Sequence, residues 1–268
     1  MAPSRTPLPN DETLPAKHHP RRLKLIIAYD GLGFSGWQSQ ANGDTIQDRL
    51  ELAFAQITGR KIRLHGAGRT DAGVHALGQC AHADLETRLE PAVLRDAVNA
   101  SLPPSIRVLS CRFVPRTFHA RFSACGKIYR YRIATTPVLS PFEVGRAWHV
   151  TSPLNDELLR ACAKEFVGQH DFAGFAAQRG TAVASTVRTI RRVRVGRAAG
   201  LTTVEVEGDG FLYKMVRLMV GAMVRCALGK TSIVKVRERL RGLALPNSRL
   251  VAPAAGLTLV RVQYDRNV

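Results

Sequence analysis

Segments with the periodicity of strands and segments with the periodicity of helices follow one another irregularly along this chain, and that order limits the folds open to it. Short apolar or alternating runs predict strands at 23–29, 61–65, 78–85, 107–113, 127–135, 187–195, 201–207 and 257–264. Helical spacing of apolar residues predicts helices at about 45–57, 91–101, 155–167, 213–228 and 233–240. Because strands and helices do not alternate one for one, the pattern predicts an α+β fold with a largely antiparallel mixed sheet.

The two parts of the chain have similar element content, which suggests an internal duplication. We therefore expect an N-terminal α/β half at 23–125 and a C-terminal α/β half at 126–268. Residues 1–22 contain four prolines before position 16 and no apolar core, so we expect a disordered leader rather than a secretory signal. Ser152 or Asn155 is expected to cap the third helix, and 196–200 to connect the 187–195 and 201–207 strands as a hairpin.

The charge of the chain points to a polyanionic partner. Lys and Arg number 39 against 21 Asp and Glu, a net charge of +18. Such an excess favours nucleic acid first and an anionic membrane second. No apolar run approaches the roughly 18 residues of a membrane span, so nucleic acid is the leading partner class.

Basic residues are also clustered in the sequence. No acid occurs from 97 to 142, and five arginines lie between 188 and 197. These two clusters predict an extended surface that follows a phosphate backbone, which gives affinity rather than base identity. The five cysteines form no CxxC pair, so we expect reduced, mostly buried thiols in a cytoplasmic protein, without a disulfide framework or zinc site.

The most unusual segment is the glycine-rich loop GAGRTDAGVHA at 66–76. Its centre holds Asp71, the only acid between Glu51 and Asp84, with four cations between 60 and 69. Nearby cations favour the ionised carboxylate, which suits a nucleophile. A dinucleotide-binding fingerprint is disfavoured, because Asp71 stands where its third glycine would lie. A purely structural turn, with the carboxylate capping backbone amides, stays open at this point.

Two other predicted elements carry candidate site residues. The 213–228 helix is apolar on most sides, with a narrow polar stripe that contains Arg217, and a cation on such a helix needs a partner such as Asp71 or a wet cleft. Tyr129 and Tyr131 share one strand face with Lys127, while Arg130 and Arg132 face the other way. Each has a structural alternative: a stripe facing solvent or RNA for the arginine, and a core position for the tyrosines, more so for Tyr131.

Several motifs in a fixed order resemble those of the TruA family of tRNA pseudouridine synthases. The motifs are AYDGLGFSGWQSQ at 28–40, GRTDAGVHA at 68–76, FHARFSACGKIYRYRI at 118–133, HDFAGF at 170–175, GFLYKMVRLMVG at 210–221 and AAGLTL at 254–259. They cover nearly the whole chain after the leader. The resemblance implies the pseudouridine synthase fold: two similar α/β halves with a largely antiparallel mixed sheet and a central basic cleft.

The resemblance also implies roles for five residues. Asp71 corresponds to the family's nucleophile, which attacks the target nucleotide at uracil C6 or ribose C1′. Arg69 corresponds to an arginine that displaces the target base and holds its phosphate region, and Arg217 to the partner of the aspartate. Tyr129 corresponds to the tyrosine that packs on the base, and Leu257 to a leucine that lines the uracil pocket. For Arg69 a plain surface cation, and for Leu257 a plain core position, are the structural alternatives.

The implied activity is the isomerisation of uridine to pseudouridine at tRNA positions 38, 39 and 40, in the anticodon arm. This reaction involves no net redox change or hydrolysis, so no cofactor and no metal are expected. The implied assembly is a cytoplasmic homodimer with two RNA-binding clefts and no membrane association. A catalytically silent RNA-binding protein on the same scaffold, and a synthase for another RNA position, are the alternative functions.

Overall fold

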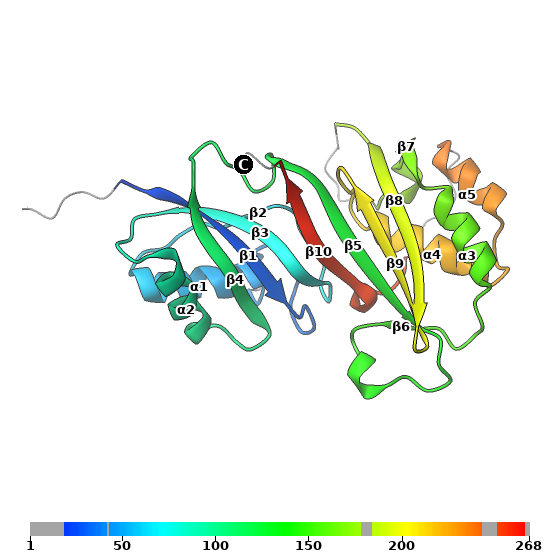
Figure 1. Ribbon diagram of the computed structural model, residues 1–268, viewed down its shortest axis with the longest axis horizontal. Coiled ribbons are helices and arrows are strands. Elements are labelled where there is room, and N and C mark those ends of the chain that lie inside the picture. The colour runs from blue at the N-terminus through cyan, green and yellow to red at the C-terminus, as the bar shows by residue number, and fades with distance from the viewer. Residues whose placement is uncertain (1–18, 42, 178–183, 243–250, 266–268) are drawn as a thin grey trace, which may run out of the picture.

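The strands form one ten-stranded sheet in the computed structural model, which describes residues 19–41, 43–177, 184–242 and 251–265. The strand order is β4-β1-β3-β10-β5-β9-β8-β7, with β2 paired to β3 and β6 paired to β5 (Figure 1). The strands are β1 (Arg21–Tyr29), β2 (His65–Gly66), β3 (His75–Leu85), β4 (Ile106–Val114), β5 (Ala124–Ala134), β6 (Trp148–His149), β7 (Gly168–Asp171), β8 (Val187–Ala198), β9 (Leu201–Gly208) and β10 (Leu257–Tyr264).

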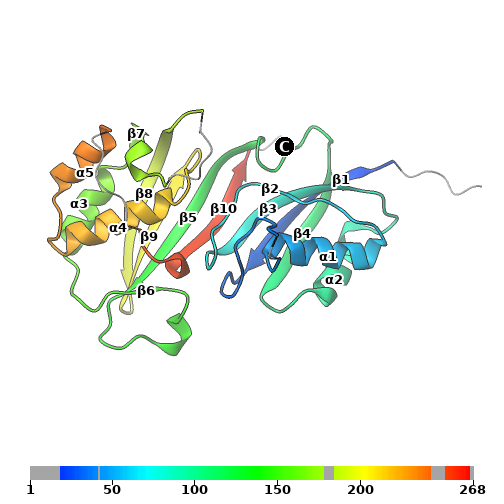
Figure 2. The same cartoon turned by 180° about the vertical axis from the view of Figure 1, so that it is seen from behind.

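Five α-helices and three short 3₁₀ turns complete the described part of the chain. The helices are α1 (Ile46–Thr58), α2 (Pro91–Ser101), α3 (Asp156–Lys164), α4 (Met215–Ala227) and α5 (Ile233–Leu240); the turns are η1 (Pro141–Glu143), η2 (Ala173–Phe175) and η3 (Ala254–Gly256). In Figure 2, α1 and α4 lie in front of the strands, whereas in Figure 1 the strands lie in front of them, so both helices cover the same face. The opposite face is left largely without helices.

The last strand joins the two ends of the chain into one sheet. β10 lies between β3 and β5, parallel to β3 and antiparallel to β5. The pairing of β5 with β6 is also parallel, and the other recorded pairings are antiparallel. The predicted α+β class and the largely antiparallel mixed sheet are therefore confirmed. The division at 125 and 126 stays a prediction and would fall near the start of β5.

Helix starts agree closely with the sequence. Thr45 caps α1 by accepting a hydrogen bond from the Asp48 amide, and Asn155, not Ser152, caps α3 through the Leu158 amide. The α3 helix ends at Lys164 rather than near 167, because the next amides bond three residues back and Gly168 follows with φ of +111°.

Several other sequence-based predictions differ from the structure; β3 and β5, for example, start three residues earlier than predicted, at His75 and Ala124. The segment 61–65 is not a strand before His65, because both backbone groups of Leu64 bond to side chains of α1. β8 continues to Ala198, so the hairpin turn is only Ala199–Gly200, both with positive φ as a two-residue turn requires. The short strands β6 and β7 were not predicted, because two to four residues show no periodicity.

The predicted leader lies mostly outside the described residues, which begin at residue 19. Arg21 and Arg22 belong to β1, so the expectation of disorder through residue 22 was wrong for these two. Arg22 is fixed by a two-pronged contact with Asp84 on β3, at 2.8 and 2.7 Å. Within the described residues, none of the helices is long and apolar enough to cross a membrane.

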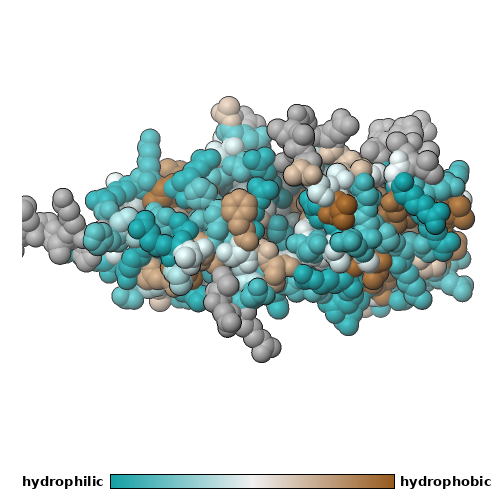
Figure 3. Space-filling view, turned by 90° about the horizontal axis from the view of Figure 1, so that it is seen from above, coloured by the Kyte–Doolittle hydropathy of each residue, from teal (hydrophilic) through white to brown (hydrophobic). Residues whose placement is uncertain are grey.

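Surface and core divide as the composition suggests. Figure 3 shows mainly hydrophilic residues on the side it views, with isolated apolar patches. The three buried cysteines, Cys80, Cys162 and Cys226, confirm the expectation of mostly buried thiols, and all five are free. Phe172 and Phe175 are fully buried; Phe175 packs edge-on against both Phe166 and Phe172, so both residues belong to the core.

Candidate active site

A basic cleft opens on the helix-covered face, between the loop after β2, strand β5 and the start of α4. Its volume is about 1090 Å³. Among the described residues that line it, Asp71 is the one carboxylate, and seven are Lys or Arg: Arg63, Arg69, Arg121, Lys127, Arg188, Lys214 and Arg217. Such an arrangement attracts a polyanion while it presents a single acidic group. We call it the Asp71 cleft.

Strand β3 and its neighbours hold the first part of the loop that carries Asp71. The Ala67 amide donates to the Cys80 carbonyl at 2.7 Å, which continues the β2–β3 pairing by one residue. The side chain of Gln79, fully buried, donates to the Gly68 carbonyl at 2.9 Å. The loop is therefore anchored through its backbone, and its side chains are left for other contacts.

A second loop supports the residue before the carboxylate. The Trp37 amide donates to the Thr70 carbonyl at 3.1 Å, and the Thr70 hydroxyl shares a 2.8 Å hydrogen bond with the hydroxyl of Tyr29. A Cβ atom on Gly36 would lie 2.5 Å from the Thr70 carbonyl oxygen, so only glycine permits this approach. Asp71 thus follows a peptide that is fixed from both sides.

Asp71 contacts Arg217 in the cleft, as we expected from the position of Arg217 on an otherwise apolar helix. Nη1 of Arg217 donates to Oδ2 of Asp71 at 2.9 Å, and Nε donates to the Ala252 carbonyl at 2.8 Å. The two side chains retain only 17% and 13% of their exposure, so the charges are half-buried and each depends on the other. Arg217 lies in the first turn of α4, where it lines the cleft together with Lys214, and most of the helix is buried in the core.

Tyr129 and Leu257 form an apolar wall beside the carboxylate. Both line the cleft and are 8% and 7% exposed, and their strands β5 and β10 are hydrogen-bonded neighbours. The Tyr129 ring packs edge-on against Phe211 with centroids 5.1 Å apart. Burial, and then the nearby Tyr29 and Asp71, raises the pKa of Tyr129 above its ordinary value, so its hydroxyl stays protonated at neutral pH.

Tyr131 is on the same face of β5 as Tyr129 but does not line the cleft. It is fully buried, and its hydroxyl donates to the Pro253 carbonyl at 2.7 Å. The core reading of Tyr131 is confirmed, and Tyr129 is the tyrosine available to a ligand.

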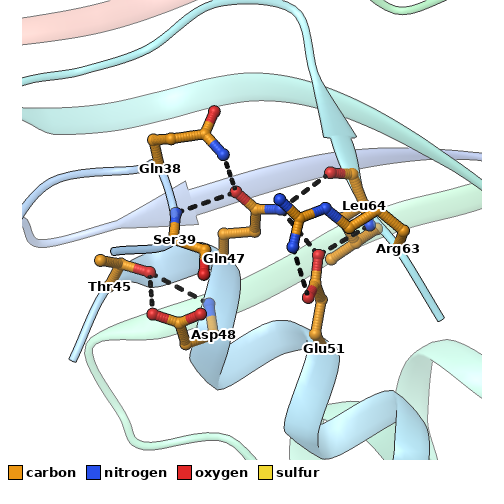
Figure 4. A network of polar contacts seen from close by, with 8 residues as sticks. All are labelled: Gln38, Ser39, Thr45, Gln47, Asp48, Glu51, Arg63 and Leu64. Atoms are coloured by element: carbon orange, nitrogen blue, oxygen red, sulfur yellow. Dashed lines mark hydrogen bonds and ion pairs between the residues drawn. The ribbon is translucent and has the colours of Figure 1, made fainter. Parts of the chain in front are cut away.

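Arg69 lies exposed at the rim and is tied to a polar network at the start of α1. Its Nε donates to Oε1 of Gln38 at 3.2 Å. Gln38 in turn donates to Gln47, which is 1% exposed and also bonds to Glu51 and the Leu64 carbonyl (Figure 4). The exposed arginine is therefore connected to a buried, fully satisfied amide.

Lys127 is a cleft residue whose importance the sequence only hinted at, through the strand face that it shares with Tyr129. Its ammonium donates to the Ala67 carbonyl at 3.0 Å. Burial, and then the charges of Arg121 and Arg188, lowers its pKa to about 8. The segment that carries His119, Arg121 and Phe122 also lines the cleft, and no periodicity predicted that.

The predicted extended basic surface is divided between the two faces of the sheet. Arg121 and Arg188 face the cleft, whereas a second hollow, about 1350 Å³, lies over the opposite face. Its arginines from the two sequence clusters are Arg107, Arg130, Arg132, Arg194 and Arg197. Several of these pair with acids, such as Arg197 with Asp156 at 2.9 Å. Residues of the two sequence clusters therefore lie on both faces of the sheet, and which of them follow a phosphate backbone stays a prediction.

The structure places all five candidate residues, Arg69, Asp71, Tyr129, Arg217 and Leu257, on the walls of one cleft. Together they offer a carboxylate held by a guanidinium, an aromatic face and an apolar wall. This set can present a nucleophile to a planar, uncharged ring whose phosphates lie among the surrounding cations.

Comparisons with known proteins agree with this geometry. A sequence model of the family described as tRNA pseudouridine synthase matches residues 25–123 and 162–265. Three curated proteins named tRNA pseudouridine synthase A are similar over nearly their full lengths. That of Akkermansia muciniphila is 45% identical over 91% of this chain and 95% of its own. Those of Methylacidiphilum infernorum and Syntrophotalea carbinolica are 42% and 43% identical, each over 90% of this chain and 94% and 96% of their own.

Proposed function

The chain belongs to the tRNA pseudouridine synthase family, isomerases that act on uridine in tRNA, and we propose that Asp71 is its nucleophile and that its targets are the uridines at positions 38, 39 and 40. The observation that carries the first part is the contact between Asp71 and Arg217 in a cleft that otherwise presents cations. The guanidinium holds this carboxylate in a fixed orientation toward the cleft, as a nucleophile requires.

In the proposed reaction, Asp71 attacks the target nucleotide at uracil C6 or ribose C1′, and the bond between N1 and C1′ breaks. The uracil turns and C5 bonds to C1′. The bond from Asp71 to the nucleotide breaks, either when C5 displaces the carboxylate from C1′ or when the carboxylate is eliminated from C6, so free Asp71 is restored. The C5 proton leaves and N1 takes up a proton. Atoms and electrons balance without an oxidant, a reductant or a cofactor. Arg69, exposed at the rim of the cleft, is proposed to occupy the space of the displaced base and to contact its phosphate.

Tyr129 is proposed to pack on the uracil ring rather than to act as the resting base. Its ring is held by Phe211, and its raised pKa leaves a neutral phenol at pH 7, which cannot take a proton unless another group first removes its own. Leu257 would cover another side of the ring, where water would otherwise reach the reacting atoms.

The assembly is proposed to be a cytoplasmic homodimer that uses the anticodon arm of tRNA as substrate. The face opposite the Asp71 cleft supports self-association, because the half-exposed Leu77 and Leu109 lie there among charged residues. Light scattering on a sizing column should give twice the chain mass of 29.4 kDa. A single-chain mass at micromolar concentration would contradict the dimer.

The nucleophile is tested with tRNA carrying tritium at uracil C5. The wild-type protein should release tritium and form pseudouridine at positions 38–40. Asp71→Asn should bind the same tRNA but release no tritium, while Asp96→Asn, on the exposed surface of α2, should behave as wild type. Full activity of Asp71→Asn would remove Asp71 from the mechanism, and product at other tRNA positions would remove the proposed targets.

A further inference from the structure

Phe122 is an aromatic side chain left in the open inside a charged cleft. It is 77% exposed, yet it lines the Asp71 cleft in the turn between β4 and β5. The hydrophobic effect favours the burial of such a ring. Its exposure inside the cleft therefore suggests that a ligand covers it when it binds.

The ring is one end of a row of four aromatic side chains, which contact one another in tilted, edge-on and stacked arrangements. Its centroid lies 4.3 Å from that of His119, which lies 4.5 Å from that of His82, which lies 5.0 Å from that of His65. His82 is 2% exposed, whereas Phe122 is at the surface. His82, in the middle of the row, is therefore buried, whereas His65 and Phe122 at its two ends are exposed and line the cleft. The His119 ring lies between His82 and Phe122 and supports the Phe122 ring.

Backbone hydrogen bonds fix the orientation of this row. Nδ1 of His119 accepts from the amides of Arg121 and Phe122 at 3.1 and 3.3 Å, and the His119 amide donates to the Ser123 hydroxyl at 3.0 Å. An Nδ1 that accepts carries no proton, so the His119 ring is a neutral platform. Burial, followed by the charge of His65, also lowers the pKa of His119. A pre-ordered aromatic surface loses little conformational entropy when a ligand stacks on it.

The neighbours of Phe122 identify the ligand as a nucleotide. The Arg121 guanidinium lies 5.6 Å from the Phe122 ring centroid and is close enough to Lys127 to lower its pKa. Lys127 bonds to Ala67, in the loop that leads to Asp71. A ring flanked by cations matches a base flanked by phosphates, because stacking and charge are then satisfied together.

We propose that Phe122, supported by His119, is a stacking platform for the base of an unpaired nucleotide other than the target uridine, with Arg121 beside it to contact the phosphate. The proposal rests on the proposed function for the identity of the RNA. It adds a second point of RNA contact in the cleft, separate from the site around Asp71. Such a point would help to hold the anticodon arm while different uridines reach the carboxylate.

The test uses full-length Asp71→Asn protein, so that binding is measured without turnover, and RNA hairpins with the sequence of a tRNA anticodon arm. One loop base at a time is replaced by fluorescent 2-aminopurine, which is quenched when it stacks. We expect quenching at a loop position other than 38–40, lost with Phe122→Ala, and a dissociation constant about 5- to 150-fold higher, the range for loss of one stacked base. Phe122→Trp should retain both the quenching and the affinity.

Phe142 offers a matched control, since it is 83% exposed but lies in η1, outside the cleft lining. Phe142→Ala should bind and quench like the parent protein. Equal affinity and equal quenching in Phe122→Ala would overturn the platform. A change of oligomeric mass in Phe122→Ala with unchanged RNA affinity would also overturn it, and would assign the ring to a protein contact.

The failure of the platform can be told apart from the failure of the enzyme assignment. Tritium release by the wild-type protein tests the activity alone and does not depend on Phe122. Quenching and affinity in the Asp71→Asn background test the platform alone, even if no pseudouridine is formed.

Discussion

Asp71 and Arg217 are 146 residues apart in sequence and meet through one 2.9 Å hydrogen bond. Neither group is fully solvated. Removal of either side chain would therefore take from the other a charge partner that water replaces only in part. Arg217 also holds the Ala252 carbonyl, which fixes the segment just before β10. One guanidinium therefore orients the carboxylate and connects two parts of the cleft, a task that suits the fork of arginine.

Arg217→Ala should lower kcat/KM by roughly 10- to 150-fold, the equivalent of about 1.5–3 kcal/mol for a hydrogen bond to a charged group. Arg217→Lys should lower kcat/KM almost as much, because a single ammonium cannot donate hydrogen bonds to both Asp71 and the Ala252 carbonyl in the way that the guanidinium does. Arg225→Ala, on the last turn of the same helix, is the control and should leave the rate unchanged. Single-turnover tritium release measures the effect, and a twofold change or less in Arg217→Ala would contradict the pairing role.

At the scale of elements, the loop at 31–37 determines where Asp71 sits. Gly36 has φ of +87° and no space for a side chain beside the Thr70 carbonyl. Gly33 has a similar φ of +83°, but nothing lies within 4 Å of the position of its Cβ. The two glycines therefore separate backbone strain from loss of contact with the Asp71 loop.

Both Gly33→Ala and Gly36→Ala should lose about 1 kcal/mol of unfolding free energy from the positive φ. Gly36→Ala should lose more, because its methyl group must displace the peptide before Asp71, and its kcat/KM should fall about tenfold or more. Urea unfolding and tritium release on the same preparations measure the two effects. Similar activity of the two variants would show that the contact between Gly36 and Thr70 does not position the carboxylate.

The elements that could be predicted from sequence are those whose signal is local. Helix α1 starts directly after its cap Thr45, helix α2 starts at Pro91, and β10 has its predicted bounds, because period and helix-start signals are properties of neighbouring residues. The contact of Arg217 with Asp71 was foreseeable because an otherwise apolar helix left that cation in need of a partner.

What could not be predicted depends on tertiary contacts. Leu64 leaves the strand pattern because Gln47 and Glu51 take its backbone hydrogen bonds. The row from His65 to Phe122 joins segments from β2, β3 and the turn before β5, and no spacing in the sequence reports it. The division of the arginines between two faces required the order of strands in the sheet.

At the scale of the whole molecule, the buried His82 links stability to pH. Burial, and then His119 and Arg22, lowers the pKa of His82 from 6.5 to about 4. Above pH 6.5 neither the native nor the unfolded chain protonates this ring. Between about pH 6.5 and 4 the unfolded chain binds a proton that the native chain does not, so the free energy of unfolding falls as the pH falls.

Urea unfolding from about pH 7.5 to 4.5 should therefore show a loss of stability that is smaller in His82→Gln than in the wild-type protein. The Asp84 carboxyl should not contribute to the pH slope in this range, because its contact with Arg22 lowers its pKa from 3.8, which moves it further below the range. His119 contributes in the same direction as His82. An equal pH slope in His82→Gln and wild type would show that the ring is not kept neutral by the fold.

The two faces of the sheet should differ in their effect on RNA binding. Arg188 and Arg194 lie on the same strand, β8, but Arg188 lines the Asp71 cleft and Arg194 lines the hollow over the opposite face. If the RNA follows the cleft, only the first neutralises a phosphate and releases counterions. Arg188→Gln should then reduce the slope of log affinity against log salt concentration by about 0.7 to 0.9, while Arg194→Gln should leave it unchanged.

Titration of tRNA at several salt concentrations measures both slopes, with Asp71→Asn as the background to prevent turnover. Equal reductions in the two variants would mean that one tRNA contacts both faces, which a single cleft cannot explain. That result would require RNA to pass around the edge of the sheet or to reach the second face through a partner subunit. Because the two arginines share a strand and a charge, their difference depends on the face alone, and so decides where the RNA lies.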